Sequence, residues 1–321
     1  MNMIRKLFII AAITMAGITC ENMLAQEHSI TPDGTYLFVQ RDTCDLFMDV
    51  YDPAEGSEKT AFGIQKPTVI FMFGGGFIHG TRDNADYHRW FRQLTDNGYR
   101  VISIDYRLGL KGSDKVGIAE GNVLDKAIHM AVEDLFSATS FILENADQFG
   151  VSPDNIVISG SSAGAITVMQ AEYEICNETS WTAELPEGFR YAGVMSFSGA
   201  ILSRKGNVDY KTAPCPTLML HGTADKLVTY KQIKFFNIGF FGGGKLVKRF
   251  KKYGLNYNMY HFVDYGHEIA ASMETTVDLQ IDFMETNVMQ KKMRIVEAWV
   301  SDPDVFKGSG PQSRKELYGN N

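Results

Sequence analysis

Cysteine is scarce in this sequence, with four in 321 residues. Cys20 lies in the N-terminal segment described below, which leaves Cys44, Cys176 and Cys215 for the rest of the chain. So small and odd a number does not make a disulfide framework, and no pair has the Cys-x-x-Cys spacing of a metal site. We expect buried free thiols. One disulfide in an oxidising compartment is the alternative, and the sequence does not choose its pairing.

Basic residues are outnumbered. The 31 Lys and Arg stand against 38 Asp and Glu, which gives a formal net charge of −7. A nucleic-acid partner is therefore not favoured, because proteins that bind nucleic acids carry an excess of positive charge on the binding surface. A neutral or weakly polar substrate fits this balance better. The chain also lacks any visible internal repeat.

Apolar runs long enough to span a membrane are absent after residue 25. Before it, Arg5 and Lys6 precede an apolar stretch at 7–18, and small residues lead to Ala25. This pattern is typical of a secretory signal peptide cleaved after Ala25, so we expect an exported protein, periplasmic or extracellular, without a stable membrane span. An uncleaved anchor helix is one alternative. Lipid attachment at Cys20 is another, although the residues before it fit the required motif poorly.

What the sequence does contain is an alternation of strand and helix patterns. The expected strands are 35–40, 45–51, 67–73, 101–106, 156–159, 192–197, 217–220 and 257–263; the expected helices are 83–97, 122–150, 165–175 and a helical region at 269–299. The first two strands share a short polar turn and should pair antiparallel. The alternation predicts an α/β fold with a mostly parallel sheet and helices on both faces. We expect one domain at 26–300 and a polar tail at 301–321.

One stretch sets a serine between a strand and a helix. The β-branched strand 156–159 runs into a Gly-x-Ser-x-Gly pattern at 160–164, and a helical pattern follows from Ala165. This context predicts Ser162 on a strained corner with its hydroxyl pointing out of the sheet edge. The N–H groups of the helix start can stabilise an oxyanion there. A flexible Gly/Ser loop without chemistry is the alternative.

A serine nucleophile needs a base and a third group that orients the base. Asp225 and His267 each follow a predicted strand, and the chain order Ser, Asp, His is that of an α/β-hydrolase. Ser162, His267 and Asp225 are therefore the expected nucleophile, base and orienting acid. Asp225 as a helix cap is one alternative, and Asp264 or Glu268 as the orienting group is another, although both lie awkwardly close to His267 in sequence.

Three glycines at 74–76 follow the strand 67–73. Residues without Cβ let backbone N–H groups approach a substrate, and a developing oxyanion needs such donors. We assign the N–H groups of Gly75, Gly76 and Ala163 to an oxyanion hole. An ordinary glycine-rich turn is the alternative, and a phosphate cradle is disfavoured because no Lys-Ser/Thr follows the glycines.

As a set, these motifs resemble the α/β-hydrolase superfamily over residues 35–290. They are Gly74-Gly75-Gly76-Phe77, Asp105-Tyr106-Arg107-Leu108, the pattern at 160–164, His221-Gly222-Thr223-Ala224-Asp225 and Gly266-His267. More narrowly, they resemble its carboxylesterase branch, which includes hormone-sensitive-lipase-like and bacterial feruloyl- or acetyl-esterase-like enzymes. The resemblance implies an eight-stranded sheet, an acyl-enzyme intermediate and no cofactor.

Two positions depart from the family pattern. Phe73 stands where the family often has a histidine that steadies the glycine loop, so packing would have to hold the oxyanion hole here. Ser161 stands where the family tends to have Asp or Glu before the nucleophile. These departures weaken the assignment to a subfamily and leave the triad untouched.

Fewer sequence features bear on the substrate. Only about twenty residues separate the strands 192–197 and 217–220, which predicts an open site without a large cap domain that could accept a large alcohol, such as a sugar or plant-polymer ester. Phe77 and an apolar glycine-rich loop at 235–244, with Phe240 and Phe241, are expected to border the substrate pocket. Core packing of that segment is the alternative.

The sequence thus predicts an exported serine carboxylesterase that acts on short-chain or carbohydrate-linked esters of acetyl or feruloyl type, with no metal or other cofactor. A serine peptidase of the same fold and a non-catalytic ligand-binding homologue are the alternatives. The acyl group, the alcohol and the oligomeric state stay open.

Overall fold

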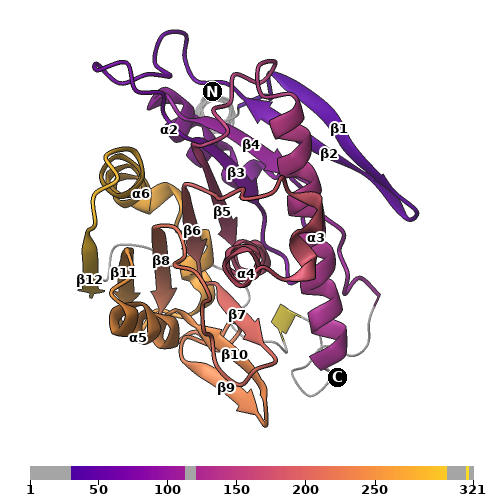
Figure 1. Cartoon of the computed structure of the whole chain (residues 1–321), viewed down its shortest axis with the longest axis vertical. Helices are drawn as coiled ribbons and strands as arrows, with labels where there is room; N and C mark the ends of the chain where they lie inside the picture. The colour runs from indigo at the N-terminus through magenta and orange to yellow at the C-terminus, as the bar shows by residue number, and fades with distance from the viewer. Residues whose placement is uncertain (1–29, 113–120, 302–315, 318–321) are drawn as a thin grey trace, which may run out of the picture.

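The computed structural model describes residues 30–112, 121–301 and 316–317. The expected signal peptide at 1–25 lies outside these residues, as does most of the expected tail at 301–321. Ordered elements begin with β1 (Gly34–Arg41) and extend to a last strand that ends at Val300 (Figure 1). No helix in the described ranges is long and apolar enough to cross a bilayer.

A nine-stranded sheet runs through the described part of the chain, in the order β1-β2-β4-β3-β5-β6-β8-β11-β12. Its strands after β1 are β2 (Cys44–Tyr51), β3 (Thr68–Met72), β4 (Arg100–Ile104), β5 (Ile156–Ser161), β6 (Gly193–Phe197), β8 (Thr217–Gly222), β11 (Tyr257–Phe262) and β12 (Ile295–Val300). β1, β2 and β4 pair antiparallel, and all other neighbours pair parallel. The predicted fold class, a mostly parallel sheet between helices, is confirmed.

Helices cover both faces of this sheet (Figure 1). They are α2 (His88–Asp96), α3 (Gly121–Glu144), α4 (Ala163–Asn177), α5 (Gly243–Tyr253) and α6 (Val277–Phe283). α3 packs against α4, and α2 packs against α6. The strands β3, β5, β6, β8 and β11 between them are buried along their whole length, which explains their nearly continuous apolar sequences.

The C-terminal end differs from the sequence prediction. The helical region expected to reach residue 299 ends in the π-helical segment η5 (Met284–Met289), and β12 then joins the sheet beside β11. The expectation of an eight-stranded sheet is therefore wrong, because β12 adds a ninth strand at the edge. The polar connection at 290–294 has no Gly or Pro to mark the change of structure, and the exposed side of β12 presents Trp299 to solvent. Pairing with β11, which lies far back in the sequence, makes this segment a strand.

A second sheet of three strands has the order β7-β10-β9, with β7 (Ala200–Ser203), β9 (Gln232–Phe235) and β10 (Ile238–Gly242). The interpretation of 235–244 as a loop is therefore wrong. Its glycines serve close packing within the sheet, since a Cβ on Gly239 would lie 2.4 Å from the ring of Phe241, and one on Gly242 would lie 1.7 Å from the Thr229 carbonyl oxygen. No sequence pattern predicts that β10 pairs with β7.

The three described cysteines are free thiols. Cys176 and Cys215 are buried, as expected, whereas Cys44 is exposed. The expectation of burial fails at Cys44 because Cys44 is the first residue of β2, next to the turn that joins β2 to the edge strand β1.

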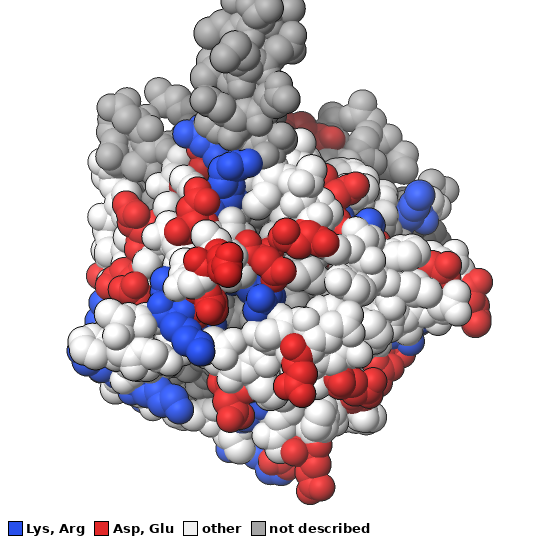
Figure 2. Space-filling model, turned by 90° about the horizontal axis from the view of Figure 1, so that it is seen from above, with Lys and Arg blue, Asp and Glu red and all other residues white. Residues whose placement is uncertain are grey.

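Acidic and basic side chains are interspersed over the face seen from above in Figure 2, and no extended basic surface is visible on it. Several pair in the interior instead. Asp134 of α3 is fully buried and accepts from Nε of Arg41 at 3.1 Å, from the Arg107 backbone N–H at 2.8 Å and from Arg107 Nη2 at 2.8 Å. One carboxylate thus joins β1, the segment after β4, and α3.

We predict that Asp134→Ala lowers the free energy of unfolding by about 3 kcal/mol or more, because it leaves two largely buried guanidinium groups without their shared carboxylate. Urea unfolding followed by circular dichroism measures the change. Asp282→Ala is the matched control: Asp282 pairs with Arg294 at the surface, and its loss should cost less than about 1 kcal/mol. Equal losses for the two variants would contradict the prediction.

Candidate active site

Ser162 occupies the corner between β5 and α4 with a backbone that few residues adopt. Its φ is 51° and its ψ is −110°. The strained conformation is held at both ends: the Ser162 N–H donates to the Phe197 carbonyl oxygen at 2.9 Å, and the Ser162 carbonyl accepts from Ile166 N–H at 2.9 Å. Non-glycine residues keep such a conformation only where the surroundings enforce it, which is common at functional sites.

The glycines on either side of Ser162 are required by close packing. A Cβ on Gly160 would lie 2.3 Å from the carbonyl carbon of Gly164, and a Cβ on Gly164 would lie 2.1 Å from the carbonyl oxygen of Met72 in β3. Both distances are well below van der Waals contact. The Gly-x-Ser-x-Gly pattern is therefore a packing requirement of the strand–corner–helix unit.

The structure brings the three expected triad residues together. Ser162 Oγ lies 2.8 Å from His267 Nε2, and His267 Nδ1 lies 2.8 Å from Asp225 Oδ2. All three residues are more than nine-tenths buried. They meet because β5, β8 and β11 are parallel, so that their carboxyl ends, from which the three residues follow, lie at the same edge of the sheet.

Both carboxylate oxygens of Asp225 accept hydrogen bonds. Its Oδ1 accepts from the backbone N–H groups of Leu227 and Val228, each at 2.9 Å. The described residues directly after Asp225 form no helix, so the alternative of a helix cap is wrong, and these two bonds hold the turn after β8 instead. Burial alone would raise the pKa of this carboxyl, but hydrogen bonds from His221 and His267 outweigh burial and hold the pKa well below its usual range.

The two alternative carboxylates do not take this place. Asp264 is exposed, and Glu268 Oε1 accepts from the Gly266 N–H at 2.8 Å. Glu268 therefore stabilises the turn that presents His267, whereas Asp225 accepts the hydrogen bond from its ring.

The glycine loop after β3 lies directly beside the serine. A Cβ on Gly74 would lie 3.0 Å from Ser161 Oγ and 3.4 Å from Ser162 Cβ. Gly75 and Gly76 have φ values of 123° and 64°, in the region that favours glycine. Ala163 is the first residue of α4, so its N–H belongs to the positive end of that helix. The three expected oxyanion donors thus come from two segments that meet at Ser162.

Two tyrosines that the sequence analysis did not assign hold this loop. The ring of Tyr106 stacks on Phe73 with centroids 4.4 Å apart, and its hydroxyl donates to the Phe73 carbonyl oxygen at 2.9 Å. The Tyr87 hydroxyl accepts from the Gly74 N–H at 3.1 Å. Packing and tyrosine hydrogen bonds therefore take the place of the missing family histidine. Tyr106 was visible in the Asp-Tyr-Arg-Leu motif; nothing in the sequence marked Tyr87.

The second departure, Ser161, also has a structural partner. Its Oγ donates to the carbonyl oxygen of Ala270 at 2.6 Å. Ala270 belongs to the short helix η3 (His267–Ala271), which begins with the triad histidine. Ser161 thereby ties the segment that carries His267 to the end of β5.

The aromatic residues expected at the substrate pocket are all buried. Phe77 follows the oxyanion loop at φ 62° and lies edge-on to Tyr106. Phe240 and Phe241 pair with β7 inside the second sheet. Their contact with substrate stays a prediction.

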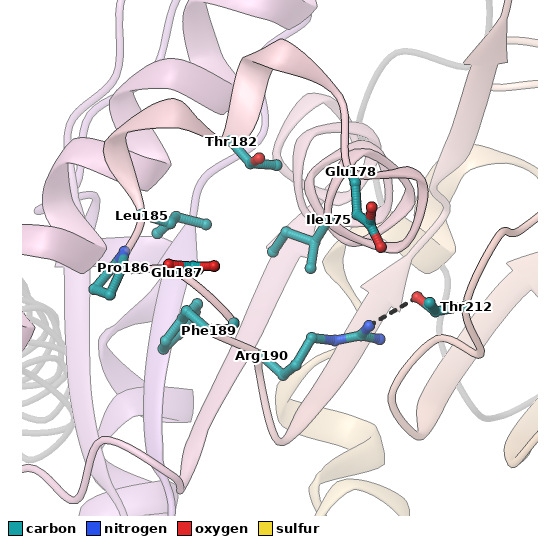
Figure 3. A pocket seen from close by; sticks show the side chains of 10 residues that line it. Ile175, Glu178, Thr182, Leu185, Pro186, Glu187, Phe189, Arg190 and Thr212 are labelled. Carbon is teal, nitrogen blue, oxygen red and sulfur yellow. Dashed lines mark hydrogen bonds between the residues drawn. The ribbon is translucent and has the colours of Figure 1, made fainter.

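A pocket of about 300 Å³ lies at the far end of α4 (Figure 3). Ser162 directly precedes this 15-residue helix, and Glu178, which directly follows it, lines the pocket, so about 24 Å separate the two. The pocket's cation, Arg190, donates to Thr212 Oγ1, Glu172 Oε1 and the Ala213 carbonyl oxygen. The Arg190 guanidinium therefore links α4 to the segment at 212–213 and has a structural role. Within the described ranges, no group of three or more His, Cys, Asp or Glu is placed to hold a metal ion.

Comparison with known proteins agrees with this geometry. Residues 48–199, just under half of the chain, match the family model described as BD-FAE. Gut esterase 1 of Caenorhabditis briggsae is 35% identical over 106 residues, which are 32% of this chain and 18% of that protein. Esterase E4 of Myzus persicae is 31% identical over 137 residues, which are 42% and 22%. Bile salt-activated lipase of Mus musculus is 29% identical over 147 residues, which are 44% and 22%. The chain spans about a fifth of the length of these relatives.

A solved structure extends the likeness to most of the chain. The esterase Est2 of the Planctomycetes species Thermogutta terrifontis superposes with a TM-score of 0.56 at 20% identity, over 78% of this chain and 91% of that one. The superposition shows the α/β-hydrolase fold. The partial sequence matches to the BD-FAE family model and to named esterases and lipases agree with the predicted resemblance to the carboxylesterase branch of that superfamily.

The lowered pKa of Asp225 has a consequence for stability. Its folded pKa lies below the ordinary aspartate value of about 3.9, so its ionised form contributes stability above that pH, and the contribution is lost as the pH falls. Asp225→Asn should therefore be less stable than wild type at pH 7, and the gap should narrow at pH 3. Urea unfolding at both pH values measures it, with Asp264→Asn at an exposed site as control. A gap that widens at pH 3 would contradict the sign.

Proposed function

We propose that the protein is a serine carboxylesterase that cleaves esters through an acyl-enzyme intermediate. The observation that carries the proposal is the continuous hydrogen-bonded chain from Ser162 Oγ through His267 to Asp225, next to a glycine loop and a helix N-terminus. The partial match to the BD-FAE family model, and the names of the esterase and lipase relatives, support the same reaction.

In this proposal each residue has one task. His267 Nε2 takes the proton of Ser162 Oγ as the oxygen attacks the ester carbonyl. The Nδ1–H of His267 donates to Asp225, which keeps Nε2 available as the acceptor and stabilises the imidazolium that forms. The N–H groups of Gly75, Gly76 and Ala163 would receive the oxyanion. His267 then returns the proton to the leaving alcohol, and water repeats the cycle on the acyl-enzyme.

We further propose short-chain or carbohydrate-linked esters of acetyl or feruloyl type as substrates. Two structures of the Thermogutta esterase, one bound to propionate and one to butyrate, each superpose with a TM-score of 0.53, which supports a short acyl group. The described insertion between β6 and β8 contains β7 and connecting segments rather than a helical cap, which supports room for a large alcohol. The apolar N-terminal stretch after Arg5 and Lys6 supports export, with lipid attachment at Cys20 as the less favoured route.

Two neighbouring serines allow a matched test of the nucleophile. We predict that a fluorophosphonate probe labels wild type and Ser161→Ala but not Ser162→Ala, since only Ser162 Oγ contacts His267 while Ser161 Oγ contacts the backbone of Ala270. For p-nitrophenyl acetate, Ser162→Ala should lower kcat on the order of 10⁴-fold or more. Ester turnover that survives Ser162→Ala would refute the mechanism.

A substrate panel tests the specificity. We expect release of acetate or ferulate from acetylated or feruloylated plant polysaccharide, because such esters pair a small acyl group or an aromatic acid with a large alcohol. Long-chain triglycerides and aminoacyl anilides complete the panel. Turnover of triglycerides alone would overturn the substrate class, turnover of anilides alone would favour a peptidase, and binding without any turnover would favour a non-catalytic homologue.

A further inference from the structure

A second histidine lies against the triad carboxylate. His221, at the end of β8 and four residues before Asp225, is 1% exposed. Its Nε2 lies 3.4 Å from Asp225 Oδ2 and 3.0 Å from the Val228 carbonyl oxygen. The proton relay proposed above passes from Ser162 through His267 to Asp225 and does not use this ring.

The hydrogen bonds of His221 identify which nitrogen carries its proton. The backbone N–H of Gly243, the first residue of α5, donates to His221 Nδ1 at 3.3 Å. An N–H group can only donate, so Nδ1 is the acceptor, and the neutral ring carries its proton on Nε2. That proton then bonds the Val228 carbonyl oxygen, and the Asp225 carboxylate lies 3.4 Å from the same nitrogen.

With His221 included, each oxygen of Asp225 faces two donors. Oδ1 accepts the N–H groups of Leu227 and Val228, and Oδ2 faces His267 Nδ1 and His221 Nε2. Val228 closes the arrangement, because its N–H donates to Asp225 and its carbonyl accepts from His221. Without His221, the only side chain on Oδ2 among these contacts would be the imidazole that Asp225 has to orient.

The surroundings keep His221 in this place. A Cβ on Gly243 would lie 3.1 Å from His221 Nδ1, so a glycine is needed for α5 to approach the ring. Tyr230 lies edge-on to it, with ring centroids 5.6 Å apart, and Tyr230 donates to or accepts from His261 Nδ1 of β11 at 2.7 Å. His261 in turn lies 3.6 Å from Glu297 of β12. These are the titratable groups around His221, together with Asp225 and His267.

We propose that His221 is a positioning residue for the triad: its Nε2–H holds the Asp225 carboxylate in the orientation that fixes His267. The proposal rests on the proposed esterase function for its kinetic consequences, but its structural content does not depend on any substrate. The proposal assigns a role to His221, the first residue of the segment 221–225, whereas the triad itself uses only Asp225 of this segment.

The first test uses the wild-type protein without substrate. We expect ¹⁵N NMR of the imidazole nitrogens to show His221 protonated at Nε2 and unprotonated at Nδ1 at neutral pH. We also expect a low-field ¹H resonance from the His267 Nδ1 proton that bonds Asp225. If His221 instead carries its proton on Nδ1 alone, it cannot donate to Asp225, and the proposal is overturned.

The second test compares three variants. His221→Phe keeps an aromatic ring but removes the donor, His221→Gln keeps a donor near the position of Nε2, and Tyr230→Phe removes a hydroxyl from the same buried cluster without touching Asp225. We expect His221→Phe to broaden or abolish the low-field resonance of His267, because Asp225 is no longer held. His221→Gln should largely restore it, and Tyr230→Phe should leave it in place.

Kinetics on an ester substrate give the third readout. For His221→Phe we expect kcat to fall by roughly 10- to 100-fold, the scale of a small misplacement in a catalytic group, with KM within about twofold.

The outcomes separate this proposal from the esterase function. A folded His221→Phe with an unchanged His267 resonance and an unchanged kcat would refute the positioning role. A wild type without ester turnover would refute the esterase function, while the NMR arms would still decide the role of His221. If His221→Phe does not fold in thermal melts, the wild-type tautomer decides: protonation at Nε2 supports the proposal, and protonation at Nδ1 alone refutes it.

Discussion

The strained backbone of Ser162 is the constraint on which the rest of the structure depends. A residue with a side chain holds φ near 51° only where strong local structure on both sides leaves it no alternative. Here the strand β5 before Ser162 is fully buried, and α4 begins at the next residue. The Ser162 N–H donates to the Phe197 carbonyl oxygen, which fixes the corner to β6. Gly160 and Gly164 let these backbones approach, because any Cβ there would overlap with main-chain atoms. The nucleophile is thus presented by the core of the sheet.

The other site residues reach this corner through the parallel strand order. Loops that follow β8 and β11 end at the same edge as the loop after β5, so Asp225 and His267 meet Ser162 from distant parts of the chain. Direct links then set the loops relative to one another. Ser161 bonds the helix η3 of His267, and Gly222 allows the acid loop to touch the base loop, since a Cβ there would lie 2.2 Å from the Gly266 carbonyl oxygen.

Sequence patterns succeeded where local chemistry and chain order carry the information. The Gly-x-Ser-x-Gly corner, the glycine loop after β3 and the polar residues after buried strands are local signals, and they were sufficient to select Ser162 and His267 and to favour Asp225 as the acid. They failed where a partner is remote. β12 and β10 become strands by pairing with β11 and β7, and Cys44 is exposed because it lies next to the turn between β1 and β2. Tyr87 holds the oxyanion loop through a single hydroxyl, which no local pattern could foretell.

The sequence by itself determined the fold class, the order of the site residues and the glycines that their backbone requires, because hydrophobic periodicity and steric limits act over a few residues. Only the tertiary structure decided which carboxylate orients His267, how the loop at Phe73 is held, and that His221 faces Asp225. Asp264 and Glu268 are closer to His267 along the chain, yet Asp225 takes the contact, because hydrogen bonds depend on distance and direction in space, which parallel strands and their loops set independently of separation in sequence.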